Sequence, residues 1–99
     1  MLVQKEYQMF TKGRNKGTYK FTLNPCNGAQ KVCLAGDFNN WEPVKMRKQK
    51  NGGYGLTIKL DPGDYQYKFQ VDDEWLLDPE NQDNALNPFG SLNSLAKVL

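Results

Sequence analysis

The most constraining feature of this sequence is a strict alternation of apolar and polar residues over residues 65–71, YQYKFQV. Successive side chains of a β-strand point to opposite faces, so the tyrosines, the phenylalanine and the valine share one face. Gln66, Lys68 and Gln70 share the other. The same period recurs in TYKFTL (18–23) and GLTIKL (55–60). Because no stretch has a helical period, these patterns predict an all-β domain.

Turn-forming clusters separate the alternating stretches about every ten residues: NPCNG, GDFNN, KNGG, DPGD and DDE. Residues 31–35 and 94–99 predict further strands, and weaker patterns cover residues 4–10 and 43–49. Residues 77–87, rich in Asp, Asn and Pro, predict one long loop. Short strands at this spacing, without helices between them, predict an antiparallel β-sandwich. A chain of 99 residues has room for one such core.

Composition narrows the possible functions. The formal charge is +2, and the absence of histidine removes the commonest general base and zinc ligand. The first ten residues lack the apolar run of a secretory signal, and no segment is long enough to span a bilayer, so we expect a cytoplasmic protein without membrane contact. Cys26 and Cys33 flank a turn that could bring them together. In a cytoplasmic protein, however, two reduced thiols are the expectation.

The charged residues favour neither catalysis nor nucleic-acid binding. Most acids lie in turns, as Asp72 and Asp73 do, and a small sandwich offers little depth for the burial that raises a carboxylate pKa. Residues 72–78 do not have the spacing of an EF-hand loop. The sequence therefore predicts no catalytic pair, no metal site and no cofactor. The basic stretch KMRKQK (45–50) is interpreted as a solvated strand face rather than a surface for single-stranded RNA, so no nucleic-acid partner is expected.

Both tryptophans lie at turns, where nothing in turn chemistry requires an indole. Trp41 ends the motif GDFNNW (36–41), and Trp75 follows the cluster DDE. Trp41 can either fold back over the core or stand outward as a flat apolar face for a ligand. Lys68 lies on the face opposite the aromatic residues of its strand, so its ammonium should point to solvent. A sugar ring packs on a flat aromatic face while its hydroxyls need hydrogen-bond partners, so this combination favours sugar binding.

Four motifs in order resemble the family 48 carbohydrate-binding modules: LAGDFNNW (34–41), YQYKFQVDDEW (65–75), LDPE (77–80) and PFGSLNS (88–94). This family includes the glycogen-binding domains of AMP-activated protein kinase β subunits and the early-set domains preceding branching and debranching enzymes. The resemblance covers about residues 18–99. It implies an immunoglobulin-like β-sandwich of early-set type and an α-1,4-glucan ligand. Residues 1–17 lie outside the resemblance and are expected to be an N-terminal segment that contributes at most one edge strand, from the weak pattern over residues 4–10.

The resemblance also implies the residues of the binding site. Trp41 and Trp75 match the two stacking tryptophans of the family, and Lys68 matches the lysine that hydrogen-bonds sugar hydroxyls. Asn93 matches the asparagine that does the same from the last strand.

Two further positions depart from the kinase-type members. Ser91 stands where those members have threonine, and Phe89 stands where a leucine reaches into the curved glucan. Phe89 can stack on the sugar or turn inward. Similar PFG and NS pairs occur in small stand-alone bacterial members. The complete set of expected ligand-binding residues is Trp41, Lys68, Trp75, Phe89, Ser91 and Asn93.

The leading hypothesis is a non-catalytic module that binds glycogen, starch or maltodextrin by stacking glucose rings on two exposed tryptophans. The alternative is a protein-interaction module of the same fold, which docks onto a glycogen-metabolising enzyme or a kinase without binding sugar itself.

Overall fold

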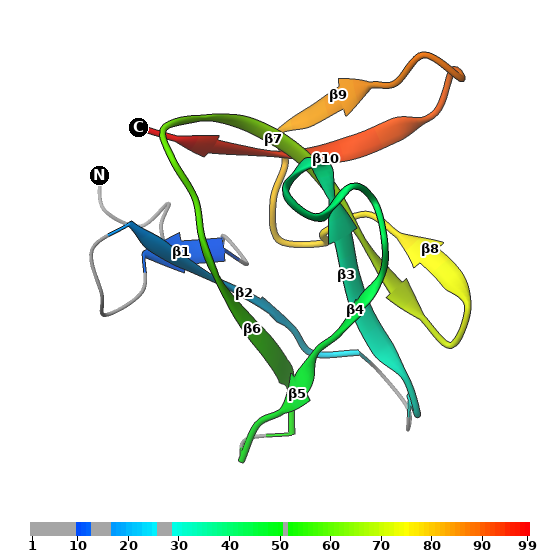
Figure 1. Ribbon diagram of the computed structural model, residues 1–99. Coiled ribbons are helices and arrows are strands. Elements are labelled where there is room, and N and C mark those ends of the chain that lie inside the picture. The colour runs from blue at the N-terminus through cyan, green and yellow to red at the C-terminus, as the bar shows by residue number, and fades with distance from the viewer. Residues whose placement is uncertain (1–9, 13–16, 26–28, 51) are drawn as a thin grey trace.

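The chain forms two antiparallel sheets that pack face to face (Figure 1). The computed structural model describes residues 10–12, 17–25, 29–50 and 52–99. The strand expected over residues 4–10 lies outside these ranges except for its last residue. Within the described residues, the antiparallel β-sandwich predicted from the sequence, of immunoglobulin-like early-set type, is confirmed.

The first sheet has the strand order β1-β2-β6-β5, and the second has the order β4-β3-β7-β10-β9, with β8 also pairing with β7. The strands of the first sheet are β1 (Phe10–Lys12), β2 (Thr18–Leu23), β6 (Tyr54–Lys59) and β5 (Arg47–Lys48). Those of the second sheet are β4 (Val44–Lys45), β3 (Val32–Gly36), β7 (Gly63–Val71), β10 (Leu92–Val98), β9 (Asn84–Leu86) and β8 (Glu74–Leu76).

The core lies between the two sheets and is built on aromatic residues of facing strands. Phe21 of β2 meets Tyr67 of β7 edge-on, with ring centroids 5.0 Å apart, and Tyr67 lies 5.9 Å from Phe69 in the same manner. These three side chains are fully buried. The alternation over residues 65–71 therefore directs Tyr67 and Phe69 into the core, which leaves the residues between them on the outer face of the second sheet.

The single strand expected over residues 43–49 is instead two short strands that belong to different sheets. β4 pairs with β3, and β5 pairs with β6. The chain changes sheets at Met46, which is buried and whose backbone N–H donates to the Val32 carbonyl at 2.8 Å. The prediction was wrong because burying Met46 between the layers stabilises the crossover more than a continuous polar edge strand would.

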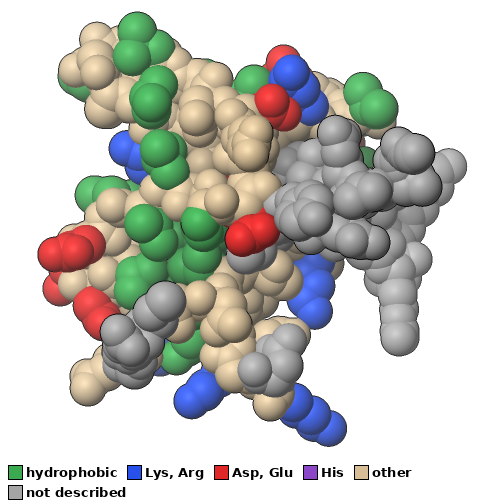
Figure 2. Space-filling model, turned by 180° about the vertical axis from the view of Figure 1, so that it is seen from behind, with side chains coloured by type: hydrophobic (Ala, Val, Ile, Leu, Met, Phe, Trp, Pro, Cys, Tyr) green, Lys and Arg blue, Asp and Glu red, His purple; other side chains and the backbone are tan. Residues whose placement is uncertain are grey.

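The long loop expected over residues 77–87 is also shorter than predicted. Its last part forms β9, whose Leu86 lies opposite Leu92 in the ladder with β10. Leu86 and Leu92 are 69% and 44% exposed because the hairpin projects beyond the facing sheet. Seen from behind, hydrophobic side chains lie on the surface of this projecting hairpin, at the upper left (Figure 2).

The hairpin between β7 and β8 has the two-residue turn that the sequence indicates. Asp72 and Asp73 adopt left-handed backbone conformations with φ of 49° and 73°. The Asp72 carboxylate also accepts backbone hydrogen bonds from Gln30 and Lys31 at 3.0 and 2.8 Å. This turn returns the chain along β7 and places Trp75 opposite Gln70 on the outer face.

Cys33 of β3 is a free, buried thiol, and Cys26 lies outside the described residues. Among the residues that the structure describes, none belongs to a helix with the length and apolarity needed to cross a bilayer.

Candidate functional site

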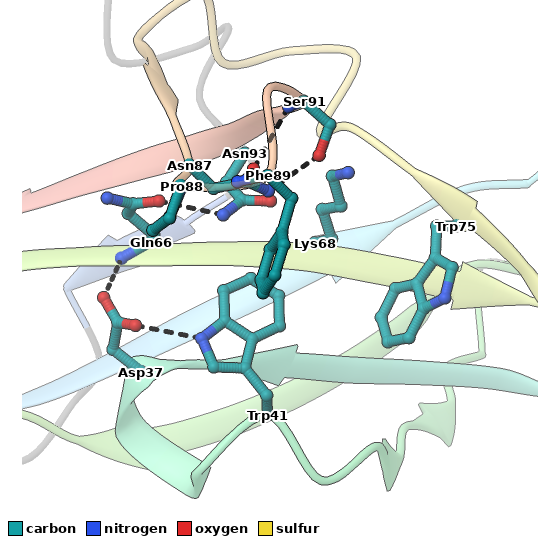
Figure 3. A pocket seen from close by; sticks show the side chains of 10 residues that line it. All are labelled: Asp37, Trp41, Gln66, Lys68, Trp75, Asn87, Pro88, Phe89, Ser91 and Asn93. Atoms are coloured by element: carbon teal, nitrogen blue, oxygen red, sulfur yellow. Dashed lines mark hydrogen bonds between the residues drawn. The ribbon is translucent and has the colours of Figure 1, made fainter.

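All six residues that the sequence singled out line one open cavity of about 500 Å³ on the outer face of the second sheet (Figure 3). They come from the turn after β3, from β7, from β8, from the turn that joins β9 to β10, and from β10 itself. The sequence therefore predicted a cluster that the fold does assemble. That these residues bind a ligand stays a prediction.

The GDFNNW turn places Trp41 at the edge of this cavity. Gly36 is required where the chain leaves β3, because an added Cβ would lie 2.7 Å from the Gln66 carbonyl oxygen. Phe38 turns back towards the core and packs on Phe21 at 5.3 Å between ring centroids. The Asn39 side chain accepts a hydrogen bond from the Gly36 N–H at 2.9 Å. With Phe38 covering the core, Trp41 is left outside it.

The two tryptophans are neighbours, but their rings are not coplanar. The ring centroids of Trp41 and Trp75 lie 6.5 Å apart, and their planes meet at 61°. Trp75 is 48% exposed and Trp41 is half-buried. Of the two orientations considered for Trp41, the structure has the outward one. The pair forms a bent apolar surface rather than one flat platform.

Polar side chains of β7 and β10 form the floor between the tryptophans and the hairpin. Lys68 and Gln66 point outward from β7, as the alternation predicts. The Asn93 side chain donates from Nδ2 to Gln66 Oε1 at 2.8 Å. Asn93 is only 5% exposed, so it reaches the cavity from below. Within the described part of the chain, the Lys68 ammonium makes no hydrogen bond or ion pair, which leaves its donors available to a ligand.

Phe89 projects from the tip of the β9–β10 hairpin and is 92% exposed, so it does not turn inward. The tip is shaped by Asn87, whose Oδ1 accepts hydrogen bonds from the backbone N–H groups of Phe89 and Ser91 at 2.9 and 3.1 Å. Asn87 Nδ2 donates to the Ser91 hydroxyl at 2.7 Å. Gly90 adopts a φ of +86°, which a residue with a side chain would resist. The hairpin therefore holds an exposed phenyl ring over the cavity.

Four further residues line the cavity and were not expected to: Asp37, Gln66, Asn87 and Pro88. The outward position of Gln66, two residues before Lys68, could have identified it. Asp37 was interpreted as a turn former only. It does shape the turn, but its carboxylate accepts hydrogen bonds from the Trp41 indole Nε1 at 2.9 Å and from the Gln66 backbone N–H at 2.7 Å.

The charges in the cavity balance. Among its lining residues, Lys68 carries a positive charge and Asp37 a negative charge. No residue of the basic stretch 45–50 lines it, and that stretch is divided between β4 and β5. Aromatic rings beside amide groups, with little net charge, suit an uncharged ligand that combines apolar faces with hydroxyls better than they suit a polyanion.

A buried polar network lies directly behind the cavity, on the inner face of β7 and β10. The Tyr67 hydroxyl donates to Asp78 Oδ2 at 2.6 Å and accepts from Asn81 Nδ2 at 2.9 Å. The Asp78 backbone N–H donates to the Ser94 hydroxyl at 2.8 Å. Burial raises the pKa of Asp78 to about 6, although the Tyr67 hydrogen bond opposes this shift. Burial, with the nearby Asp78 charge, also raises the pKa of Tyr67.

The expectation that no carboxylate would be buried deeply enough to have a raised pKa is therefore wrong. Residues 77–83 do form a loop, but the side chains of Asp78 and Asn81 turn inward from it and bond to the Tyr67 hydroxyl. These contacts take Asp78 out of water. The carboxylate lines no part of the cavity, so this burial does not add an acid or base to the site.

Most of the chain matches a known protein family. Residues 15–99 match the family model described as the glycogen recognition site of AMP-activated protein kinase.

Individual relatives agree with this match. A 54-residue segment is 46% identical to protein PTST homolog 2, chloroplastic, from Arabidopsis thaliana, covering 54% of this chain and 10% of the plant protein. A 71-residue segment is 32% identical to the 5'-AMP-activated protein kinase subunit beta-1 of Rattus norvegicus, covering 72% of this chain and 26% of the rat protein. The chain thus spans about a tenth to a quarter of the length of these two relatives.

Among solved structures, the maltogenic amylase from S. marinus aligns with a TM-score of 0.71 and 30% sequence identity. The alignment covers 93% of this chain and 15% of the amylase chain. The same sandwich thus occurs as one part of a longer protein.

Proposed function

Because this chain belongs to the family of glycogen recognition sites of AMP-activated protein kinase, we propose that its cavity binds α-1,4-glucans by stacking glucose rings on Trp41 and Trp75. The chain acts as a binding module and performs no catalysis. The ligand is a glycogen, starch or maltodextrin chain, held without a metal or a cofactor.

The observation that carries this proposal is the bent pair of indoles beside Lys68, whose ammonium has no partner among the residues that the structure describes. An α-1,4-linked glucan curves, so successive glucose rings do not lie in one plane. Two aromatic faces 6.5 Å apart and inclined by 61° suit such a bent chain better than a flat ribbon. Lys68 and the Asn93–Gln66 pair lie where the hydroxyls at the ring edges would need partners. Phe89 supplies a third apolar surface from the opposite side of the cavity.

The expected affinity is low. If each indole removes about 100 Å² of apolar surface from water at ~25 cal/mol/Å², the gross gain is roughly 2.5 kcal/mol per ring. The ordering of a flexible sugar and the loss of translational freedom offset much of this gain. We therefore expect a Kd between about 10 μM and 1 mM. A polymer with many chain ends raises the effective affinity of such a site.

A second candidate function is supported by two exposed leucines. Leu86 and Leu92 lie opposite one another in the β9–β10 ladder, both are exposed, and neither lines the cavity. The relatives are longer proteins, among them kinase subunits. A module that uses these leucines to dock onto a glucan-active enzyme or a kinase would need no sugar at all.

Isothermal titration with maltoheptaose distinguishes the two functions. The wild type is expected to bind, and Trp75→Ala is expected to weaken binding at least tenfold because it removes one of the two stacking faces. Leu86→Ala is the matched control, since it truncates an exposed apolar side chain outside the cavity and should leave the Kd unchanged. Absence of heat from the wild type would reject the glucan proposal and favour the docking function.

A further inference from the structure

The GDFNNW turn holds Trp41 in a backbone conformation that a bulky residue rarely adopts. Asn40 and Trp41 are both left-handed, with φ of 55° and 59°. Asparagine tolerates this region, whereas tryptophan does so at a cost of roughly 1 to 2 kcal/mol. The Trp41 backbone N–H donates to the Gly36 carbonyl at 2.9 Å, which closes the turn. Strain of this kind persists only where surrounding contacts fix the conformation, and it occurs most often at functional sites.

One side chain connects the strained residue to the rigid part of the fold. Asp37 Oδ1 accepts a hydrogen bond from Trp41 Nε1 at 2.9 Å, and Asp37 Oδ2 accepts one from the Gln66 backbone N–H at 2.7 Å (Figure 3). Gln66 belongs to β7, which pairs with β3 on one side and with β10 on the other. The carboxylate therefore ties the indole to the central strand of the second sheet. A charged acceptor makes both bonds stronger than neutral ones would be.

The second indole of the cavity has no such hydrogen bond within the described part of the chain. Trp75 Nε1 makes no hydrogen bond to any residue in the described ranges, and the ring is 48% exposed (Figure 3). The cavity thus combines one indole whose position is fixed with one that is free to adjust. Since both line the same cavity, Trp75 serves as an internal reference for any measurement on Trp41.

We infer that Asp37 is a positioning residue of the binding site, which fixes the angle of the Trp41 indole before a glucan arrives. This inference rests on the proposed function and assigns a role within it. A ring that is already oriented loses less conformational freedom on binding than a mobile ring, so it gives a higher affinity for the same contact area. Asp37 itself need not touch the sugar.

A purely structural role for Asp37 makes a different prediction. If the carboxylate only supplies an acceptor to the Gln66 N–H at the end of the β3–β7 ladder, its removal lowers stability but acts equally on any aromatic ring at position 41. If it positions the indole, its effect on affinity requires the indole N–H. Phenylalanine lacks that N–H but keeps an aromatic face, so it separates the two roles.

The test is a double-mutant cycle with maltoheptaose binding as the readout. Asp37→Ala in the native background is expected to raise the Kd about three- to tenfold, the effect of freeing one immobilised side chain. In the Trp41→Phe background, Asp37→Ala should change the Kd by less than about twofold. Asp64→Ala is the matched control because it removes an exposed carboxylate of β7, two residues before Gln66 and outside the cavity, and should bind like the wild type. An equal loss in both backgrounds would overturn the inference.

A measurement without sugar keeps this test independent of the proposed function. The chain has two tryptophans, so an amide-region NMR spectrum of the ¹⁵N-labelled protein contains two indole N–H signals. The Trp41 signal should exchange with solvent more slowly than that of Trp75, and Asp37→Ala should accelerate the exchange of Trp41 alone. Asp37→Asn, which keeps the side-chain volume but directs an amide donor at one of the two N–H groups, serves if the alanine variant does not fold. If the Trp41 indole N–H of the folded variant exchanges as slowly as in the wild type, the positioning role is refuted. If the wild type does not bind maltoheptaose, only the glucan proposal is refuted.

Discussion

In β7 and in β10, adjacent residues point into two different environments. Tyr67 and Ser94 point inward, where they join the buried network with Asp78, while their neighbours Lys68 and Asn93 point outward into the cavity. The inward groups are paired with one another at 2.6 to 2.9 Å. On the outer face, the ammonium of Lys68 has no partner within the described residues. One stretch of sheet therefore carries a closed polar network on one side and an open one on the other.

Residues that stabilise the fold and residues that line the cavity are therefore direct neighbours along the same strand. Buried polar groups stabilise a fold only when all of them are satisfied, and losing one partner costs the desolvation of the other. Exposed polar groups lose little when a partner is absent, because water replaces it. Since side chains alternate along a strand, substitutions on the inner face should change the free energy of unfolding, and those on the outer face should change affinity.

The largest expected effect is the difference in the free energy of unfolding between substitutions at two adjacent residues, Tyr67 and Lys68. Tyr67→Phe keeps the ring but leaves the buried Asp78 carboxylate without its hydroxyl donor, so we expect a loss of roughly 2 to 3 kcal/mol in the free energy of unfolding. Lys68→Ala should change that free energy by less than about 0.5 kcal/mol. Urea denaturation at pH 7 measures both.

Affinity for maltoheptaose should follow the reverse order, with Tyr67→Phe unchanged and Lys68→Ala weakened about threefold or more. A Tyr67→Phe protein that is folded yet binds poorly would break the comparison. It would mean that the inner network shapes the cavity rather than only supporting the strands behind it.

The two faces of β7 could be predicted from the sequence. The alternation over residues 65–71 assigns Tyr67 and Lys68 to opposite faces without any knowledge of the partner strands. This assignment depends only on neighbours in sequence, so a local pattern was sufficient. That Trp41, Trp75 and Phe89 share one site was implied by the family resemblance and not by any local pattern.

Features that depend on distant contacts were not predicted. Met46 divides an apparent strand because it reaches the core between two sheets, and nothing in its immediate neighbours indicates this. Asp78 has the composition of a loop residue, but its partners Tyr67 and Ser94 lie 11 and 16 positions away. Asp37 could be recognised as a turn former, whereas its bond to the Gln66 backbone depends on how β3 and β7 pair. Each of these required the packed structure.

A smaller effect is expected on the pH dependence of the free energy of unfolding, and it comes from Asp78 in the inner network. The pKa of Asp78 is raised from 3.8 to about 6 in the folded protein, so the folded state holds a proton at a pH where the unfolded state has lost it. The resulting stabilisation is complete below about pH 4 and is lost as the pH rises through about 6. Asp78→Asn lacks this titration. The stability of the wild type relative to Asp78→Asn should therefore fall by roughly 1 kcal/mol between pH 5 and pH 7.

Thermal or urea unfolding of both proteins at several pH values measures this difference. Asp83→Asn is a suitable control, because Asp83 is an exposed acid in the same loop as Asp78. A relative stability that rises with pH would show that the Tyr67 hydrogen bond outweighs burial and lowers the pKa instead.

The smallest expected effect is on the Kd for maltoheptaose when Phe89, at the tip of the β9–β10 hairpin, is substituted. It tests whether glucan binding on the outer face extends to this ring. Phe89 is 92% exposed, so Phe89→Ala removes almost no buried surface and should leave the free energy of unfolding within about 0.5 kcal/mol of the wild type. If the ring closes over a bound glucan, the same change should raise the Kd for maltoheptaose about two- to fivefold. Phe89→Leu should recover part of the loss, because an aliphatic side chain restores apolar contact without a stacking face. Equal affinities for all three proteins would confine glucan binding to the two tryptophans and leave the exposed phenyl ring to another partner.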